Sequence, residues 1–177
     1  MKTGAGAVLV SRPDIQRRIT ELGGQISSDY AGRALTVIGI LKGSFIFVAD
    51  LVRQISPEIP VEVDFMSVSS YGNSTSSSGT VRVEYDAEVE IAGRDVIIVE
   101  DIVDTGLTLL HVHNILSERG ANSLKVATLL EKPGQRKYDR QLDYVGFQIT
   151  NEFVVGYGLD YAQRYRNLPE IRILDEI

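Results

Sequence analysis

One stretch of this chain, residues 96–108, constrains its fold more than any other. The stretch begins with four apolar residues, 96–99, that lack the polar alternation of a half-exposed strand. Such a run predicts a strand that is buried on both faces, as in a parallel sheet. Acids follow at its carboxyl end, where open α/β sheets bind their ligands. They are Glu100, Asp101 and Asp104.

Residues 105–108 come next, and the small Gly106 and the hydroxylated Thr105 and Thr108 among them predict the start of a helix. Thr105 or Thr108 can cap that helix, and the free N–H groups of its first turn form an anion site beside Gly106. The preceding carboxylates suit diol oxygens or Mg²⁺. One short loop therefore offers amides for a phosphate and acids for hydroxyl groups, a combination that fits a phosphorylated sugar.

Other interpretations of this loop require features that the chain lacks. The tripeptide Asp104-Thr105-Gly106 alone could simply end a strand and begin a helix. Aspartic proteases use the same tripeptide, but their two acids come from two lobes, and this chain has no second copy. A Walker-type phosphate loop requires a Gly-Lys-Ser/Thr ending, which is also absent.

Length and composition predict one ordinary globular domain over residues 1–177. Hydrophobic residues make up 44% of the chain and charged residues 24%. The net charge of −6, without a cluster of basic residues, argues against nucleic acid as the main partner. There are no cysteines, which excludes disulfides and thiolate sites. No apolar run approaches membrane-spanning length, so we expect no membrane association and a cytoplasmic location.

The rest of the chain alternates strand and helix patterns. Ser11 and Pro13 predict the start of a helix, and residues 45–52 predict another. Apolar runs predict the remaining strands, at 35–41, 61–68, 81–85, 124–130, 145–149, 153–157 and 171–174. This alternation predicts an α/β fold with a parallel sheet that helices cover on both faces.

Residues 69–80 have the most unusual composition in the chain, with six serines among twelve residues. They have little to bury, so they form either a passive linker or a hairpin arm that closes over a site as a lid. On a separate segment, His111 and His113 lie two positions apart on a predicted helix. They cannot face one ligand together, and we interpret them as non-catalytic.

The string 100–108 resembles the phosphoribosyl pyrophosphate signature of the type I phosphoribosyltransferases. Further segments resemble the hypoxanthine–guanine phosphoribosyltransferases in particular, and they lie at 41–45, 70–71, 130–132, 143–147, 153–161 and 164–168. The resemblance implies a central parallel sheet flanked by helices, with a small hood and a flexible hairpin lid at about 69–80. It covers nearly the whole chain from Ser11 onward.

The resemblance also assigns roles to residues around the sugar. Glu100 and Asp101 would hold the ribose hydroxyls and a Mg²⁺ ion. The cradle for the sugar's terminal phosphate would comprise Asp104, Thr105, Gly106, Leu107 and Thr108. Some family members have a lysine where this chain has Leu107, so a side-chain charge is lost there while the backbone amide remains.

The purine and the pyrophosphate would be bound by other segments. Lys132 would donate to the exocyclic oxygen of the purine, with Phe153 and Ile102 on opposite faces of the ring and Val154 at its edge. Asp160 would border the base and hold a second Mg²⁺. The implied pyrophosphate contacts are Lys42, Gly43, Ser70, Tyr71 and Arg166. Within the family the bond equivalent to Leu41–Lys42 can be cis, which the sequence cannot show.

The implied reaction moves the 5-phosphoribosyl group from phosphoribosyl pyrophosphate to N9 of hypoxanthine or guanine. Its products would be IMP or GMP and pyrophosphate, with Asp104 taking or sharing the purine N7 proton. The resemblance further implies two Mg²⁺ ions per site and a homodimer or homotetramer. Two alternatives stay open: a regulator that senses phosphoribosyl pyrophosphate, and a transferase for another base such as xanthine or a pyrimidine.

Overall fold

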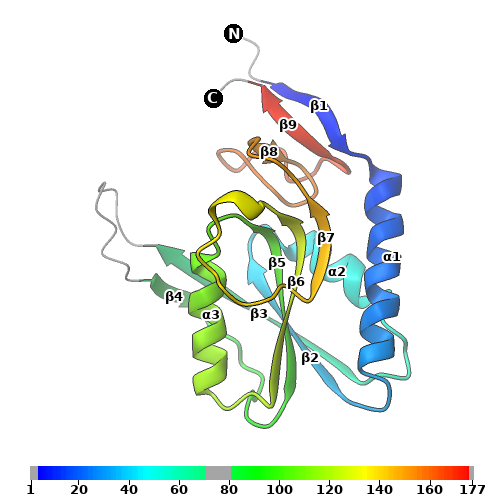
Figure 1. Ribbon diagram of the computed structural model, residues 1–177, viewed down its shortest axis with the longest axis vertical. Helices are drawn as coiled ribbons and strands as arrows, with labels where there is room; N and C mark the ends of the chain where they lie inside the picture. The colour runs from blue at the N-terminus through cyan, green and yellow to red at the C-terminus, as the bar shows by residue number, and fades with distance from the viewer. Residues whose placement is uncertain (1–3, 71–80, 176–177) are drawn as a thin grey trace.

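The computed structural model describes residues 4–70 and 81–175, and a six-stranded sheet forms its centre. The strands lie in the order β4-β3-β2-β5-β6-β7, and only β4 is antiparallel to its neighbour (Figure 1). Their bounds are β2 Leu35–Leu41, β3 Val61–Ser70, β4 Val81–Tyr85, β5 Asp95–Val103, β6 Ser123–Glu131 and β7 Tyr144–Gln148. The predicted α/β fold with a central, mostly parallel sheet is therefore confirmed.

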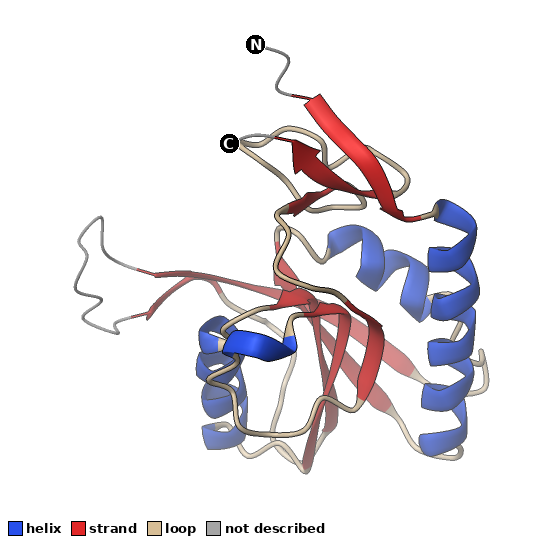
Figure 2. Ribbon diagram, turned by 45° about the horizontal axis from the view of Figure 1, so that its top comes forward, coloured by secondary structure: helices blue, strands red, loops and turns tan. Residues whose placement is uncertain are grey.

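Helices cover both faces of this sheet (Figure 2). Helices α1 (Arg12–Asp29) and α2 (Phe45–Val52) pack on one face, and α3 (Leu107–Glu118) packs on the other. The apolar run of β5 serves both cores, because Ile97 and Val99 face α1 and α2 while Ile98 faces α3. That arrangement explains why the run shows no polar alternation.

Helix α1 begins where the sequence predicts. The Ser11 Oγ accepts a hydrogen bond of 3.3 Å from the Asp14 N–H, and Pro13 lies in the first turn. The helix continues through Gly23, where a Cβ atom would lie 2.4 Å from Gln54 Cβ. The glycine therefore allows α1 to lie close against the residues that follow α2. Among the described helices, none combines the length and the apolar character needed to span a membrane.

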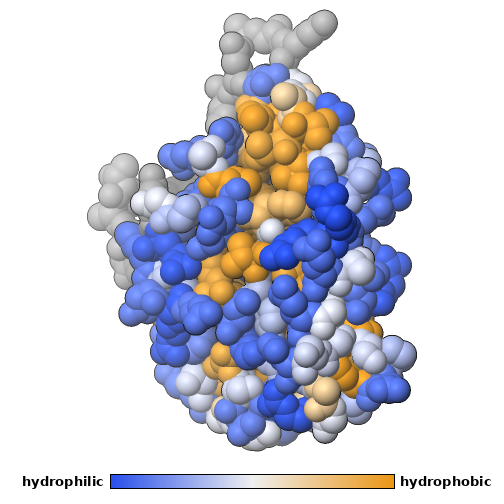
Figure 3. Space-filling view, turned by 45° about the vertical axis from the view of Figure 1, so that its right-hand side comes forward, coloured by the Kyte–Doolittle hydropathy of each residue, from blue (hydrophilic) through white to orange (hydrophobic). Residues whose placement is uncertain are grey.

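A second, smaller sheet forms the hood above the carboxyl ends of the central strands. It joins β1 (Gly4–Val10), β9 (Ile171–Asp175) and β8 (Val154–Val155), all antiparallel (Figure 1). The sequence analysis did not predict β1. It also predicted a longer strand at 153–157, but the backbone turns at Gly156, which has a φ of +100°. The face seen from the side of α1 is mostly hydrophilic, with its main apolar area toward the hood (Figure 3).

Strands β3 and β4 flank the predicted lid, as expected for a hairpin arm. Ser69 and Ser70 belong to β3, whereas Tyr71 and the remainder of the predicted lid lie outside the described residues.

Candidate active site

A cavity of about 350 Å³ opens at the carboxyl ends of β2 and β5. Its walls come from four separate parts of the chain: the end of β2 with the turn after it, Val68 of β3, the end of β5 with the start of α3, and the loop that follows β8. Most of the predicted site residues line it together, namely Lys42, Gly43, Glu100, Asp101, Ile102, Asp104, Thr105, Gly106, Leu107, Thr108, Asp160 and Arg166.

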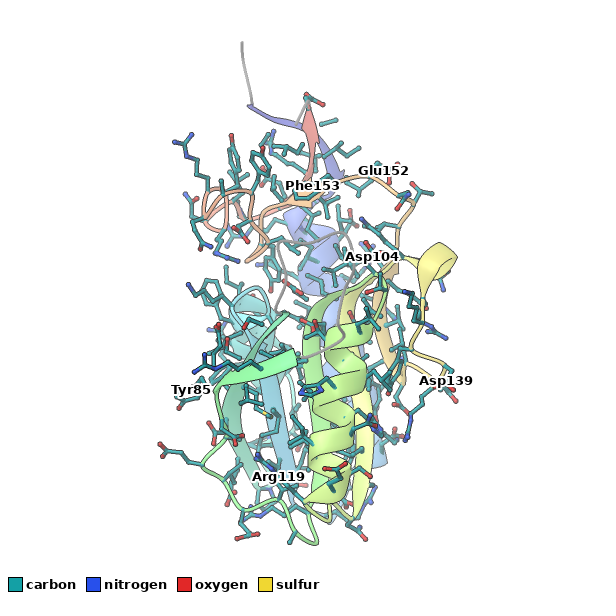
Figure 4. All side chains as sticks on the ribbon, turned by 90° about the vertical axis from the view of Figure 1, so that its left-hand side faces the viewer. Tyr85, Asp104, Arg119, Asp139, Glu152 and Phe153 are labelled. Atoms are coloured by element: carbon teal, nitrogen blue, oxygen red, sulfur yellow. The ribbon has the colours of Figure 1, made fainter. Side chains whose placement is uncertain are left out.

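A second cavity, also of about 350 Å³, lies beside the first. Lys132 lines it, together with residues that the sequence analysis missed: Pro133, Gly134, Ile149, Thr150 and Asn151. Asp104 contributes to both cavities. Figure 4 shows this aspartate between the top of α3 and the segment that carries Glu152 and Phe153. The Pro-Gly pair after Lys132 was the only signal in the sequence for this wall.

Glu100 and Asp101 lie within β5, which corrects the expectation that the strand ends before them. The Asp101 N–H donates to Glu100 Oε1 at 3.1 Å, and the Ile102 N–H donates to Asp101 Oδ1 at 2.7 Å. Burial raises the pKa of both carboxyls, and the neighbouring Asp101 charge raises the pKa of Glu100 further. Two adjacent buried acids of this kind favour a cation.

The turn after β2 packs directly against Asp101. The Leu41–Lys42 bond is cis, as the family resemblance allows. A Cβ atom at Gly43 would lie 1.5 Å from Asp101 Oδ2, so only glycine fits between the turn and this carboxylate. The backbone of the turn thereby forms one wall of the first cavity.

Gly106 begins α3, and the predicted cap by Thr105 or Thr108 is wrong. Gly106 is the N-cap residue with a φ of +73°, and no side chain caps the helix. Thr108 lies inside the first turn, and Thr105 Oγ1 is a distant 3.5 Å from the Leu107 N–H. A Cβ at Gly106 would approach Tyr138 Cβ to 2.6 Å. Packing of this loop against Tyr138 therefore favours glycine, and the first-turn amides remain available to an anion.

Asp104 has one carboxylate oxygen in an ion pair and one without a partner. Lys132 Nζ lies 3.8 Å from Asp104 Oδ2. Asp104 Oδ1 is buried and lacks a hydrogen-bond partner among the described residues. The Lys132 N–H donates to the Val103 carbonyl oxygen at 2.9 Å, which fixes the lysine beside the end of β5. An unpartnered buried carboxylate oxygen can accept a hydrogen bond or a proton from a bound ligand.

Comparison with known proteins decides the family. Residues 8–162 match the phosphoribosyl transferase domain. The chain is 49% identical to the hypoxanthine-guanine phosphoribosyltransferase of Bacillus subtilis, over 98% of this chain and 96% of that one. It is 50% identical to the enzyme of that name from Streptococcus agalactiae serotype V, over 96% and 93% of the two chains.

The chain belongs to the hypoxanthine-guanine phosphoribosyltransferase family. It is therefore a transferase of purine salvage. A solved hypoxanthine-guanine phosphoribosyltransferase from Bacillus anthracis superposes with a TM-score of 0.92 at 46% identity and covers 97% of this chain and all of that one.

Asp160, which was assigned to the purine and a second Mg²⁺, pairs with Arg166, which was assigned to the pyrophosphate. Arg166 Nη2 lies 2.8 Å from Asp160 Oδ1, and Arg166 Nη1 donates to the Gly158 carbonyl oxygen at 2.7 Å. The Gln163 N–H donates to the other Asp160 oxygen at 2.8 Å. Gln163 was not predicted, and its backbone role leaves no signature in the sequence.

Phe153 and Val154 line neither of the two cavities. Phe153 is 42% exposed and stands edge to face on Tyr161, with ring centroids 5.8 Å apart. Val154 is buried in the hood strand β8. Their assignment to the purine stays a prediction.

Family membership implies a divalent metal for binding phosphoribosyl pyrophosphate, and the acids present fit one. Within residues 4–70 and 81–175, no group of three acids or histidines gathers around one point. Mg²⁺ characteristically takes one or two carboxylates and completes its shell with water and substrate phosphates. The adjacent pair Glu100 and Asp101, whose pKa values burial raises, offers such a partial set.

Proposed function

We propose that this protein transfers the 5-phosphoribosyl group of phosphoribosyl pyrophosphate to N9 of hypoxanthine or guanine, yielding IMP or GMP and pyrophosphate. The placement of Asp104 carries the proposal. This residue lines both cavities, and Lys132 lies 3.8 Å from its Oδ2. Its Oδ1 is buried and has no partner within the described part of the chain. A general base that takes a proton from the purine while it faces the sugar phosphate should lie where the two cavities meet.

The sugar phosphate fits the first cavity. The amides of residues 105–108 would bind the terminal phosphate, since no side chain caps this helix start. Glu100 and Asp101 would face the ribose hydroxyls and hold a Mg²⁺ ion, and Asp160 would hold a second. Bound Mg²⁺ would neutralise charge on the pyrophosphate group.

The pyrophosphate would lie between the turn at Lys42 and Gly43 and the Arg166 guanidinium. Arg166 is held by Gly158 and Asp160, so its position is fixed before substrate binds. Negative charge grows on the departing pyrophosphate, and a fixed cation stabilises that charge most effectively. Ser70 and Tyr71 would close over it and exclude water, because the cationic sugar centre is otherwise hydrolysed.

The purine would enter beside Lys132. Its ammonium group is donor-only, which suits the 6-oxo group of hypoxanthine and guanine and not the amino group of adenine. Phe153 and Ile102 would contact the two ring faces, with the Val154 backbone and Asp160 at the edge. Asp104 would then take or share the N7 proton as N9 attacks the sugar.

A base screen tests the proposal. The purified protein is incubated with phosphoribosyl pyrophosphate, Mg²⁺ and each of hypoxanthine, guanine, xanthine, adenine and uracil, and nucleotide formation is followed by chromatography. We expect IMP and GMP. XMP alone or UMP alone would indicate the enzyme for another base. Tight binding of phosphoribosyl pyrophosphate without any product would indicate the sensor.

We propose a single domain from the length and composition of the chain, and a cytoplasmic location because no apolar run approaches membrane-spanning length. From the family resemblance we propose a homodimer or homotetramer. Light scattering at micromolar concentration measures the mass of the oligomer directly, and a monomer mass would contradict the proposed homodimer or homotetramer.

A further inference from the structure

Tyr157 has a strained backbone and a buried side chain in the loop that carries Asp160 and Arg166. Its φ is +51°, a left-handed value that favours glycine, and it stands between Gly156 and Gly158. Only 6% of the residue is exposed. A tyrosine kept in this conformation indicates that its side chain makes a contact that glycine could not replace.

That contact is a hydrogen bond to a different part of the fold. The Tyr157 hydroxyl donates to Asp50 Oδ2, on helix α2 and 107 positions away in the sequence. The other Asp50 oxygen pairs with Arg53. Burial and the Asp50 hydrogen bond raise the pKa of Tyr157, so the hydroxyl keeps its proton and remains the donor.

Helix α2 begins at Phe45, directly after the turn at Lys42 and Gly43. The bond from Tyr157 to Asp50 thus links the two walls that face each other across the pyrophosphate side of the first cavity. The walls also meet through backbone, since a Cβ at Gly158 would lie 2.2 Å from the Gly43 carbonyl oxygen. The same Gly158 accepts the hydrogen bond from Arg166.

The backbone hydrogen bonds of this loop run within the hood and its own turn. The Tyr157 N–H donates to the Leu168 carbonyl oxygen at 2.8 Å, and the Gly158 N–H donates to the Arg166 carbonyl oxygen at 3.0 Å. These bonds shape the loop but do not fix its distance from α2. The side-chain bond to Asp50 can fix that distance.

We propose that Tyr157 and Asp50 form a positioning pair that sets the spacing between the Lys42–Gly43 turn and the Asp160–Arg166 wall, and so governs binding of the pyrophosphate group. Neither side chain lines either of the two cavities of the site. The inference rests on the proposed function and adds to it two residues that act through the position of others.

Tyr157→Phe is the direct test, because it removes the hydroxyl and keeps the ring and the backbone. We expect KM for phosphoribosyl pyrophosphate to rise about tenfold, and KM for pyrophosphate in the reverse reaction to rise equally. KM for hypoxanthine should stay the same. Asp50→Ala should match this result, and Asp50→Asn, which keeps an acceptor oxygen, should restore most of the binding. The double variant should be no worse than either single variant.

Tyr144→Phe is the matched control. The Tyr144 hydroxyl also donates to a carboxylate, Asp29 Oδ2 at 2.5 Å, but near the amino ends of the strands. This variant should lower Tm about as much as Tyr157→Phe and leave KM for phosphoribosyl pyrophosphate unchanged. An unchanged KM in Tyr157→Phe, or an equal rise in both tyrosine variants, would overturn the proposal.

Direct binding separates this proposal from the proposed function. If the wild-type protein transfers to no base, the proposed function fails. Calorimetric binding of inorganic pyrophosphate with Mg²⁺ then still compares wild type with Tyr157→Phe. About tenfold weaker binding supports the positioning pair, and equal binding refutes it.

Discussion

The central sheet carries acids, lysines and tyrosines at both ends, and the two ends differ in how these groups are paired. Near the amino ends of the strands, Asp29 accepts from Lys125 at 2.8 Å and from the Tyr144 hydroxyl. Lys125 also lies over the rings of Tyr30 and Tyr144, 5.5 and 5.3 Å from their centroids. Asp95 accepts from the side chains of Asn122 and Ser123 at 2.7 Å each.

At the carboxyl ends several acids and one lysine, those that line the cavities, are left incompletely paired. Glu100 and Asp101 lie side by side and accept hydrogen bonds from neighbouring backbone N–H groups. Asp104 keeps one oxygen without a partner among the described residues. Lys132 is 3.8 Å from its acid, whereas Lys125 is 2.8 Å from Asp29. Unpaired buried groups cost stability. The buried Tyr30 hydroxyl near the amino ends also lacks a partner among the described residues. The acids at the carboxyl ends, however, line the two cavities of the site, which indicates that a ligand completes them.

The largest expected effect comes from Asp104→Asn. Removing the proposed proton acceptor should lower kcat by about 10²–10⁴-fold, while phosphoribosyl pyrophosphate still binds. Tm should not fall, because the unpartnered buried oxygen costs stability in the folded protein and the ion pair with Lys132 is long, at 3.8 Å. Steady-state kinetics and calorimetry of the same sample measure both quantities. An unchanged kcat would remove Asp104 from the mechanism.

Lys132→Ala should have the next largest effect. Loss of a charged hydrogen bond to the 6-oxo group should lower kcat/KM for hypoxanthine and for guanine by roughly 10–100-fold together. The long distance to Asp104 predicts little change in Tm. If the variant only raises KM for phosphoribosyl pyrophosphate, Lys132 does not recognise the purine.

Lys125→Met is the counterpart at the opposite end of the sheet. It removes an ion pair and two contacts with aromatic rings, so the free energy of unfolding should fall by about 1–2 kcal/mol. All kinetic constants should match the wild type. Lys125→Arg, which keeps the charge, serves as the control. A kinetic defect in Lys125→Met would show that the two ends are not independent.

The smallest expected effect is on how the Tm difference between wild type and Lys125→Met depends on acidic pH. Hydrogen bonds from Lys125 and Tyr144 lower the pKa of Asp29 below the usual carboxyl value. A lowered pKa in the folded state gives stability that is full above the unfolded pKa, about 3.9, and lost as pH falls through the folded value. The Tm difference between wild type and Lys125→Met should therefore shrink between pH 5 and pH 2. A constant difference would mean that the ion pair contributes nothing.

The strands around the site could be predicted because their signals are local. Strand β2 matches the predicted run at 35–41, and the helix after Ser11 begins at its predicted cap. The wrong cap of α3 and the missed strand β1 both depend on contacts between residues that are distant in sequence. Gly106 begins α3 because Tyr138 packs against it, and β1 exists because β9 pairs with it. The segment Gly4–Val10 is recognised as a strand only once its pairing with β9 is known.

The site itself was predicted through the family resemblance, and its fine geometry was not. The sequence contains Gly43 and Asp101 but does not show that one fits against the other. The second cavity needed residues 149–151, which follow β7 and look like an ordinary loop. Their approach to Lys132 depends on the pairing of β6 with β7.

The hood is built from the first and the last strands of the described chain, with β1 paired along β9. Strand β1 leaves the ribosome well before strand β9 does. The phosphate loop at the start of α3 can therefore form well before the wall that carries Asp160 and Arg166, whose strand β8 needs β9 as its neighbour. Closure of that long sequence separation is a slow step in folding. The nascent chain consequently lacks the wall that carries Asp160 and Arg166 until β9 has been synthesised and has paired with β8.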